Sequence, residues 1–73
     1  MIRKKSVILS AYREKNTRFL DILTILGALE NRGFKMTKKG LSNFVRNNLE
    51  YKYLISSKDT KGTIVGWELV GSY

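Results

Sequence analysis

Polar side chains recur through residues 37–50 at the spacing of one helix face. At 100° per residue, one side of such a helix carries Lys39, Asn43, Arg46 and Glu50, flanked by Ser42 and Asn47. The opposite side carries apolar residues, namely Leu41, Phe44, Val45 and Leu49. Arginine and asparagine can form paired hydrogen bonds with the edges of guanine and adenine, and lysine binds phosphates. The polar face of this helix therefore has the side chains needed to read a nucleic acid.

The charge of the whole chain agrees with a polyanionic partner. Among 73 residues, 14 Lys and Arg stand against six Asp and Glu, which gives a net charge of +8. Nucleic acid is the commonest partner of so basic a chain, and an anionic membrane or an acidic protein surface are the alternatives. We expect double-stranded DNA.

Other chemistry is poorly supported by the composition. The chain contains neither cysteine nor histidine, so it lacks the usual nucleophile–base pairs and the usual metal ligands. The glycine beside Lys61 is not part of a phosphate-binding loop, because no second glycine precedes it at the required spacing. We therefore expect no enzymatic activity, no cofactor and no metal.

A single domain over residues 1–73 is expected from the length. The longest apolar stretch is shorter than the roughly 20 residues that a membrane span needs, and it contains Asp21. We expect no membrane association and a cytoplasmic location, which would be the host cytoplasm or nucleoid for a viral protein.

The apolar stretch Phe19–Leu29 is the candidate core. Eight of its eleven residues are apolar, and a helix apolar nearly all round must be buried on several sides. The pattern predicts one helix that begins after Asn16 or Thr17 and runs to about Asn31, with Gly33 in the left-handed conformation beyond its end. Its surplus apolar surface must be covered by residues 5–15 or by a second subunit, and we expect the protein to be a homodimer.

Residues 5–15 fit either a helix or a strand, and we favour the helix. Thr37 is the expected N-cap of the polar-faced helix, which should end near Glu50 or Lys52. A hairpin should follow, with strands over 53–57 and 63–70. In the return strand we expect alternate residues to face inward, namely Thr63, Val65, Trp67 and Leu69, and Gly66 to mark a bulge or a close backbone approach.

At this point the chain resembles the winged helix-turn-helix DNA-binding domains. The resemblance covers about residues 37–70, and its strongest part is LSNFVRNNLEYKYLISSKDTKGTIVGWELV. It implies a small α+β fold of two to three helices followed by a C-terminal β-hairpin, the wing. It also implies a recognition helix over about 37–50 in the major groove and a wing over 53–70 on the DNA backbone.

The residues that this resemblance places against DNA are Lys38, Lys39, Ser42, Asn43, Arg46 and Asn47 on the helix and Lys58 and Lys61 on the wing. Three N-terminal residues, Arg3, Lys4 and Lys5, are further candidates for phosphate contacts. A winged helix also has a short second helix, and none fits between Gly33 and Thr37. The central helix is therefore expected to position the recognition helix.

The function expected from these observations is transcriptional regulation of viral, phage or plasmid type. A strand at residues 5–15 would instead resemble the ribbon-helix-helix repressors, which read DNA with an N-terminal strand and are obligate dimers. Two further alternatives are a protein-binding module that docks on and inhibits an acidic host protein, and an RNA- or ribosome-associated protein.

Overall fold

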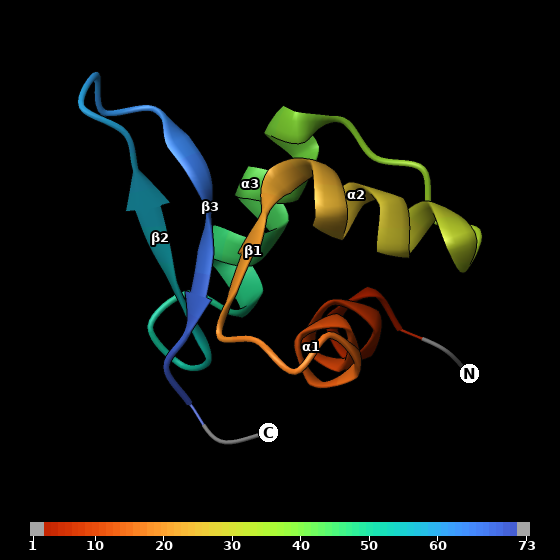
Figure 1. The fold of residues 1–73 in the computed structure, drawn as a ribbon. Helices are drawn as coiled ribbons and strands as arrows, with labels where there is room; N and C mark the ends of the chain where they lie inside the picture. Colours follow the sequence, from red (N-terminus) through yellow and green to blue (C-terminus); the bar gives the residue numbers. More distant parts are fainter. Residues whose placement is uncertain (1–2, 72–73) are drawn as a thin grey trace.

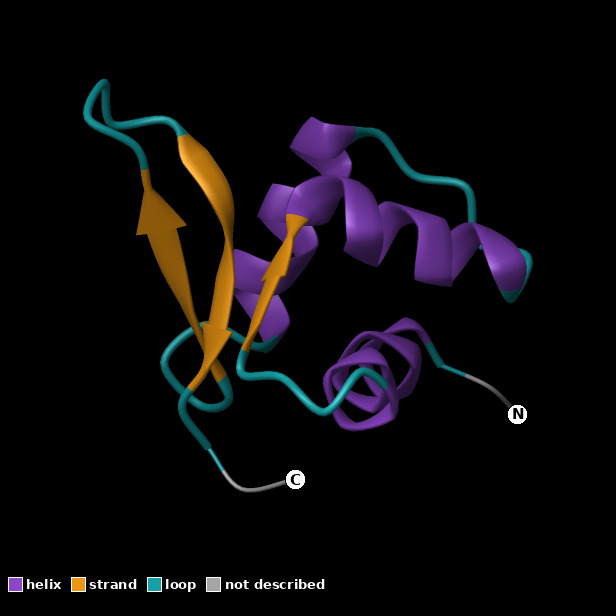
Figure 2. Ribbon diagram, in the orientation of Figure 1, coloured by secondary structure: helices purple, strands orange, loops and turns teal. Residues whose placement is uncertain are grey.

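A computed structural model describes residues 3–71 of the chain. The first elements along the chain are α1 (Lys4–Glu14), the short strand β1 (Phe19–Asp21), α2 (Ile22–Asn31) and α3 (Lys38–Asn48). A hairpin of β2 (Leu54–Lys58) and β3 (Ile64–Leu69) follows. The three helices lie together on one side of the sheet (Figures 1 and 2). The described part of the chain is thus a small α+β fold.

The sheet has three antiparallel strands, with β3 between β1 and β2. Trp67 of β3 is paired with Leu20 on one side and with Ser56 on the other. The hairpin register shifts between Ser57 and Lys58, which pair with Gly66 and Ile64. Val65 is therefore the extra residue of a β-bulge.

The bulge corrects the predicted inward face of the return strand. Trp67 is buried, Leu69 is half-buried, and both Thr63 and Val65 are exposed. Gly66 lies where the backbone of β1 approaches β3 closely. An added Cβ there would collide with the carbonyl oxygen of Leu20 and lie 2.9 Å from the Cα of Asp21. The bulge and the close backbone approach expected at this glycine are both present.

The core lies between the helices and the inner face of the sheet. Its largest fully buried side chains come from all three helices, the hairpin and the turn before it; they are Trp67, Tyr12, Ile8, Leu9, Ile25, Leu29, Leu41, Leu49, Leu54 and Val45. The Tyr12 hydroxyl donates a hydrogen bond of 2.7 Å to the Trp67 carbonyl oxygen. This bond ties α1 to the central strand.

The prediction of a single helix that begins after Asn16 or Thr17 is wrong for the first turn of that helix. Phe19–Asp21 is a strand, because its backbone pairs with Glu68, Trp67 and Gly66 of β3. Helix α2 begins at Ile22 instead. Asp21 caps it by accepting a hydrogen bond of 2.9 Å from the Thr24 backbone N–H. The predicted end near Asn31 is confirmed, and Gly33 has the expected left-handed conformation, with φ of 90°.

Residues 4–14 form a helix, so the N-terminal strand that the ribbon-helix-helix alternative requires is absent from the part of the chain that the structure describes. Five residues of α1 are buried, namely Val7, Ile8, Leu9, Ala11 and Tyr12. Helix α1 therefore covers much of the apolar surface of α2. Leu23 of α2 is the main exception, with 65% of its side chain exposed.

Candidate nucleic-acid interface

Helix α3 presents two chemically different sides. Leu41, Val45 and the C-capping Leu49 are completely buried, and the polar residues between them face outward. The Thr37 hydroxyl accepts a hydrogen bond of 3.0 Å from the Gly40 backbone N–H, so the predicted N-cap is confirmed. The helix ends at Asn48, slightly before the predicted Glu50 or Lys52.

The first turn of α3 carries cations and no acidic residue. Lys38 and Lys39 are both exposed there, beside backbone N–H groups that carry partial positive charge. Lysine is unfavourable at this end of an isolated helix, and an anion would relieve the repulsion. The start of α3 therefore has the electrostatics of an anion-binding surface.

The central part of the polar face is organised by one side-chain hydrogen bond. The Arg46 guanidinium donates from Nη2 to Oδ1 of Asn43 at 2.7 Å. Both residues are exposed, as is Asn47, whereas Ser42 is half-buried. Of the residues predicted on the helix, Ser42 is thus the least accessible. The bond to Asn43 uses one donor of the arginine, which is the strongest candidate reader of a base.

The tip of the hairpin is fixed by Asp59. Its Oδ1 accepts hydrogen bonds from the backbone N–H groups of Lys61, at 2.9 Å, and Thr63, at 3.0 Å. Gly62 provides the left-handed residue of this turn, with φ of 83°. Lys58 at the end of β2 and Lys61 at the tip are exposed. The two lysines predicted on the wing therefore lie on a structured loop.

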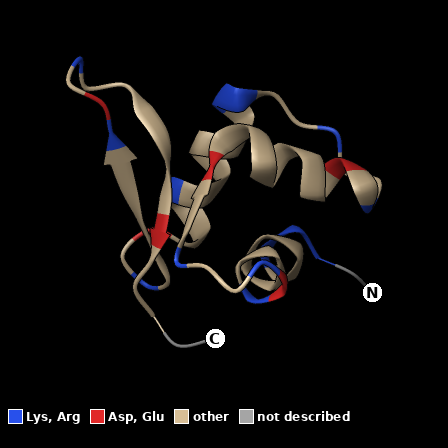
Figure 3. Cartoon of the chain, viewed as in Figure 1, with Lys and Arg blue, Asp and Glu red and all other residues tan. Residues whose placement is uncertain are grey.

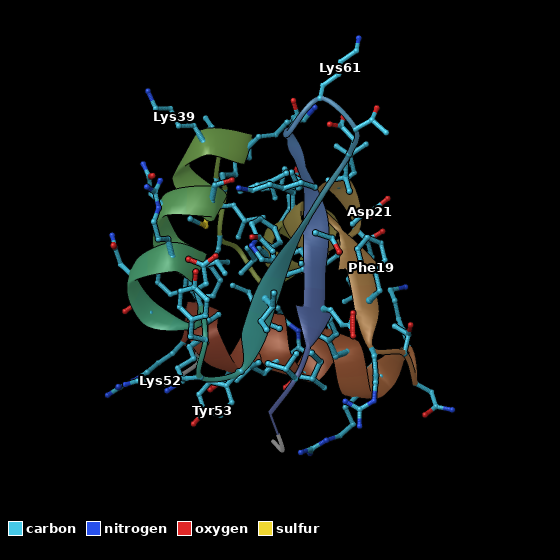
Figure 4. The ribbon with its side chains drawn as sticks, turned by 90° about the vertical axis from the view of Figure 1, so that its left-hand side faces the viewer. Phe19, Asp21, Lys39, Lys52, Tyr53 and Lys61 are labelled. Atoms are coloured by element: carbon cyan, nitrogen blue, oxygen red, sulfur yellow. The ribbon has the colours of Figure 1, made fainter. Side chains whose placement is uncertain are left out.

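Helix α3 and the hairpin bring their cations to one end of the molecule. Figure 4 shows the Lys39 and Lys61 side chains projecting at the same end, from the start of α3 and from the hairpin tip. In the cartoon of Figure 3, Lys and Arg mark the hairpin tip and the start of α3, and acidic residues mark β1, β3 and the hairpin loop beside the tip. A ligand lying along α3 can therefore reach the hairpin tip as well.

The predicted N-terminal contacts lie against α3 and the base of the hairpin. The Lys4 ammonium lies 5.8 Å from the centre of the Phe44 ring, and the Lys5 ammonium lies 5.0 Å from the centre of the Tyr53 ring. Both distances are within the range of cation–π attraction. Arg3, the N-cap residue of α1, is exposed.

Lys52 is a basic residue of this region that the sequence analysis did not select. It is exposed in the turn between α3 and β2, beside the Tyr53 ring that Lys5 approaches. Figure 4 shows Lys52 and Tyr53 at the end of the molecule opposite to Lys39 and Lys61. No local pattern marks Lys52, because its neighbours in space come from α1.

Residues 3–71 contain no group of three or more acidic side chains placed to hold a metal ion. No helix in this described range is long and apolar enough to cross a membrane. Comparison of the chain with known protein families, with curated proteins and with solved structures finds no match. The geometry of the basic surface is therefore the basis on which the function of this chain is inferred.

Proposed function

We propose that the protein binds duplex DNA as a winged helix, with α3 in the major groove and the β2–β3 hairpin as the wing. The observation that carries this proposal is the shared end of α3 and the hairpin, at which Lys39 and Lys61 project together. A duplex is long enough to contact both elements at once, and its phosphates match their charge.

The observed helices support the winged-helix proposal better than the sequence did. Because residues 19–21 form β1, the remaining α2 is a ten-residue helix that precedes α3. In the proposed winged helix, this α2 would be the second helix and would position α3. The connection between them is six residues long, from Arg32 to Thr37, which is more than the three to four typical of a helix-turn-helix.

The roles proposed for the side chains follow from their chemistry. Arg46 and Asn43 lie on the outer face of α3 and would contact bases. Lysines at the start of α3 and on the wing would contact phosphates, namely Lys38, Lys39, Lys58 and Lys61. These four contacts alone would make log K fall with log salt at a slope of about −4, and any further phosphate contact would make the slope steeper.

The first experiment is a titration of a random duplex of about 25 base pairs at several salt concentrations from about 50 mM. We expect measurable binding at the lowest salt, with the slope given above. A structured RNA of equal charge is the comparison. Tighter binding of the RNA would favour an RNA-associated protein, and failure to bind either nucleic acid would favour the acidic-protein partner.

Two variants test the division between base and phosphate contacts, after a preferred site has been selected from a pool of random duplexes. Arg46→Ala should lose about 1–3 kcal/mol on the selected site and much less on random DNA. Lys61→Ala should weaken binding to both and reduce the salt slope by about 1. Equal losses on both DNAs for both variants would contradict these roles.

We propose further that the protein acts as a homodimeric transcriptional regulator of viral, phage or plasmid type. The exposed Leu23 lines a groove of about 590 Å³ between α1 and α2 that also contains polar and charged residues, and a second subunit bound there would cover Leu23. Sedimentation should then show twice the 8.4 kDa mass of one chain. A monomer at the concentrations that bind DNA would contradict this proposal.

A further inference from the structure

The turn between α3 and β2 contains an aromatic residue in an unfavourable position. Tyr51 has a left-handed backbone, with φ of 68°, and 81% of its side chain is exposed. Glycine or asparagine adopts this conformation at lower cost, whereas a bulky residue there is strained. Because the ring is so exposed, little packing compensates for the strain. Strained, exposed residues of this kind are concentrated at functional sites.

The backbone of the turn holds the ring outward. The Tyr51 N–H donates a hydrogen bond of 2.8 Å to the Leu54 carbonyl oxygen, and the Lys52 N–H donates one of 3.2 Å to the Leu49 carbonyl oxygen. Both acceptors belong to completely buried residues. The Tyr51 side chain is therefore presented to solvent by a turn that is anchored to the core.

Cations from two elements gather at this turn. Lys52 is exposed within it, and the Lys5 ammonium is brought from α1 to within 5.0 Å of the adjacent Tyr53 ring. Glu50, which is half-buried, is the acidic residue of the turn. The surface thus combines a phenol and ammonium groups, which are hydrogen-bond donors suited to phosphate oxygens.

This turn lies at the far end of the candidate interface. In Figure 4, Lys52 and Tyr53 mark one end of α3 and the hairpin, and Lys39 and Lys61 mark the other. The 11 residues of α3 span about 16 Å at 1.5 Å per residue. That length corresponds to about five base pairs of 3.4 Å. A duplex that follows α3 would therefore extend from one cationic cluster to the other.

We propose that the α3–β2 turn is a second phosphate-binding point for the duplex that α3 binds. In it, the Tyr51 hydroxyl donates to a backbone phosphate, and the Lys52 and Lys5 ammonium groups supply the charge. This inference depends on the proposed DNA binding and adds a contact at the end of α3 opposite to the wing tip.

The test uses the full chain, the random duplex described above and four variants, one of which is the positive control Lys39→Ala at the other end of α3. Tyr51→Asn places a residue that tolerates the left-handed conformation, so it should raise the Tm by about 4 °C and yet weaken binding about fivefold. Lys52→Ala should keep the wild-type Tm and reduce the salt slope by about 1. The matched control is Lys35→Ala, which removes one charge beside α2, in a hollow lined by Leu23 and Glu30. It should leave the slope unchanged.

The possible outcomes separate this inference from the proposed function. If Tyr51→Asn and Lys52→Ala bind like the wild type while Lys39→Ala loses affinity, the second contact is wrong and the DNA-binding proposal stands. Equal slope changes in Lys35→Ala and Lys52→Ala would show an effect of net charge alone and would also overturn the inference. Failure of the wild type to bind the duplex would reject the proposed function itself.

Discussion

The buried hydroxyl of Tyr12 joins α1 to the central strand, and its removal in Tyr12→Phe should destabilise the fold. Tyr12 is 1% exposed, and its hydroxyl donates to the Trp67 carbonyl oxygen at 2.7 Å. Phenylalanine keeps the ring and removes only the donor, so the carbonyl oxygen loses that partner in a site closed to water. The expected loss is about 1–2 kcal/mol, which lowers the Tm by about 5–15 °C for a chain of this size.

The pH dependence of the protein's stability provides a second, independent test of this prediction. Burial raises the pKa of the Tyr12 phenol above its ordinary value of 10.0, so the folded protein keeps the proton when the unfolded chain has lost it. This contribution to stability is fully present below pH 10 and is lost as the pH rises further. At pH 11 the loss is about 1.4 kcal/mol in the wild type. Tyr12→Phe has no phenol at this position and escapes the loss.

The stability gap between the two proteins should therefore be about 1–2 kcal/mol at pH 7 and nearly absent at pH 11. Urea unfolding followed by far-ultraviolet circular dichroism measures both values. Tyr51→Phe is the control, because that side chain is 81% exposed and should change neither value. Equal stability of Tyr12→Phe and the wild type at pH 7, or a gap of the same size at pH 11, would refute the reasoning.

Three other substitutions test how β1 and α2 are held. Gly66→Ala should cost about 3 kcal/mol, because its Cβ would collide with the Leu20 carbonyl oxygen. Gly27→Ala should stabilise α2 by about 1 kcal/mol, because nothing lies within 4 Å of the added Cβ. Thermal unfolding should therefore show a lower Tm for Gly66→Ala and a higher Tm for Gly27→Ala. Hydrogen bonds from the Thr24 side chain and backbone N–H hold the pKa of Asp21 below its usual value. Asp21→Ala should therefore lower the Tm at pH 7, and the difference from the wild type should narrow as the pH falls through the Asp21 pKa. Asp21→Asn, which can still cap α2, is the control.

Features that depend on nearby residues were predictable from the sequence. The two sides of α3, its cap at Thr37 and the hairpin follow from patterns that repeat within a few residues. The left-handed Gly33 and the close approach at Gly66 were also expected, because glycine is the residue that permits both. For these elements, local preference and tertiary structure agree.

Strand β1 could not be predicted from the sequence, because residues 19–21 form a strand through their backbone pairing with β3. Phe19 and Leu20 continue the apolar spacing of α2, so the sequence reads as one helix. In the fold, Leu20 pairs with Trp67, which lies 47 residues later in the chain. The two clusters at the ends of α3 arise in the same way. Lys5 reaches Tyr53 only after α1 packs beside the hairpin, and no spacing within the sequence reports that contact.

The core and the candidate interface lie on opposite sides of α3, so residues of one can be substituted without altering the other. Leu41 and Val45 are completely buried, whereas Asn43 and Arg46 are exposed. Loss of DNA binding in Arg46→Ala at an unchanged Tm would therefore be a surface effect.

The β2–β3 hairpin differs from α3 in this respect, because its position depends on the core. Trp67 and its hydrogen bond with Tyr12 fix β3, and β3 leads back from the tip that carries Lys61. Removal of that bond in Tyr12→Phe should disturb the DNA contact proposed for Lys61 before those proposed for α3. At temperatures below its Tm, Tyr12→Phe should therefore lose part of the salt slope of DNA binding and retain the sequence preference that we propose for Arg46.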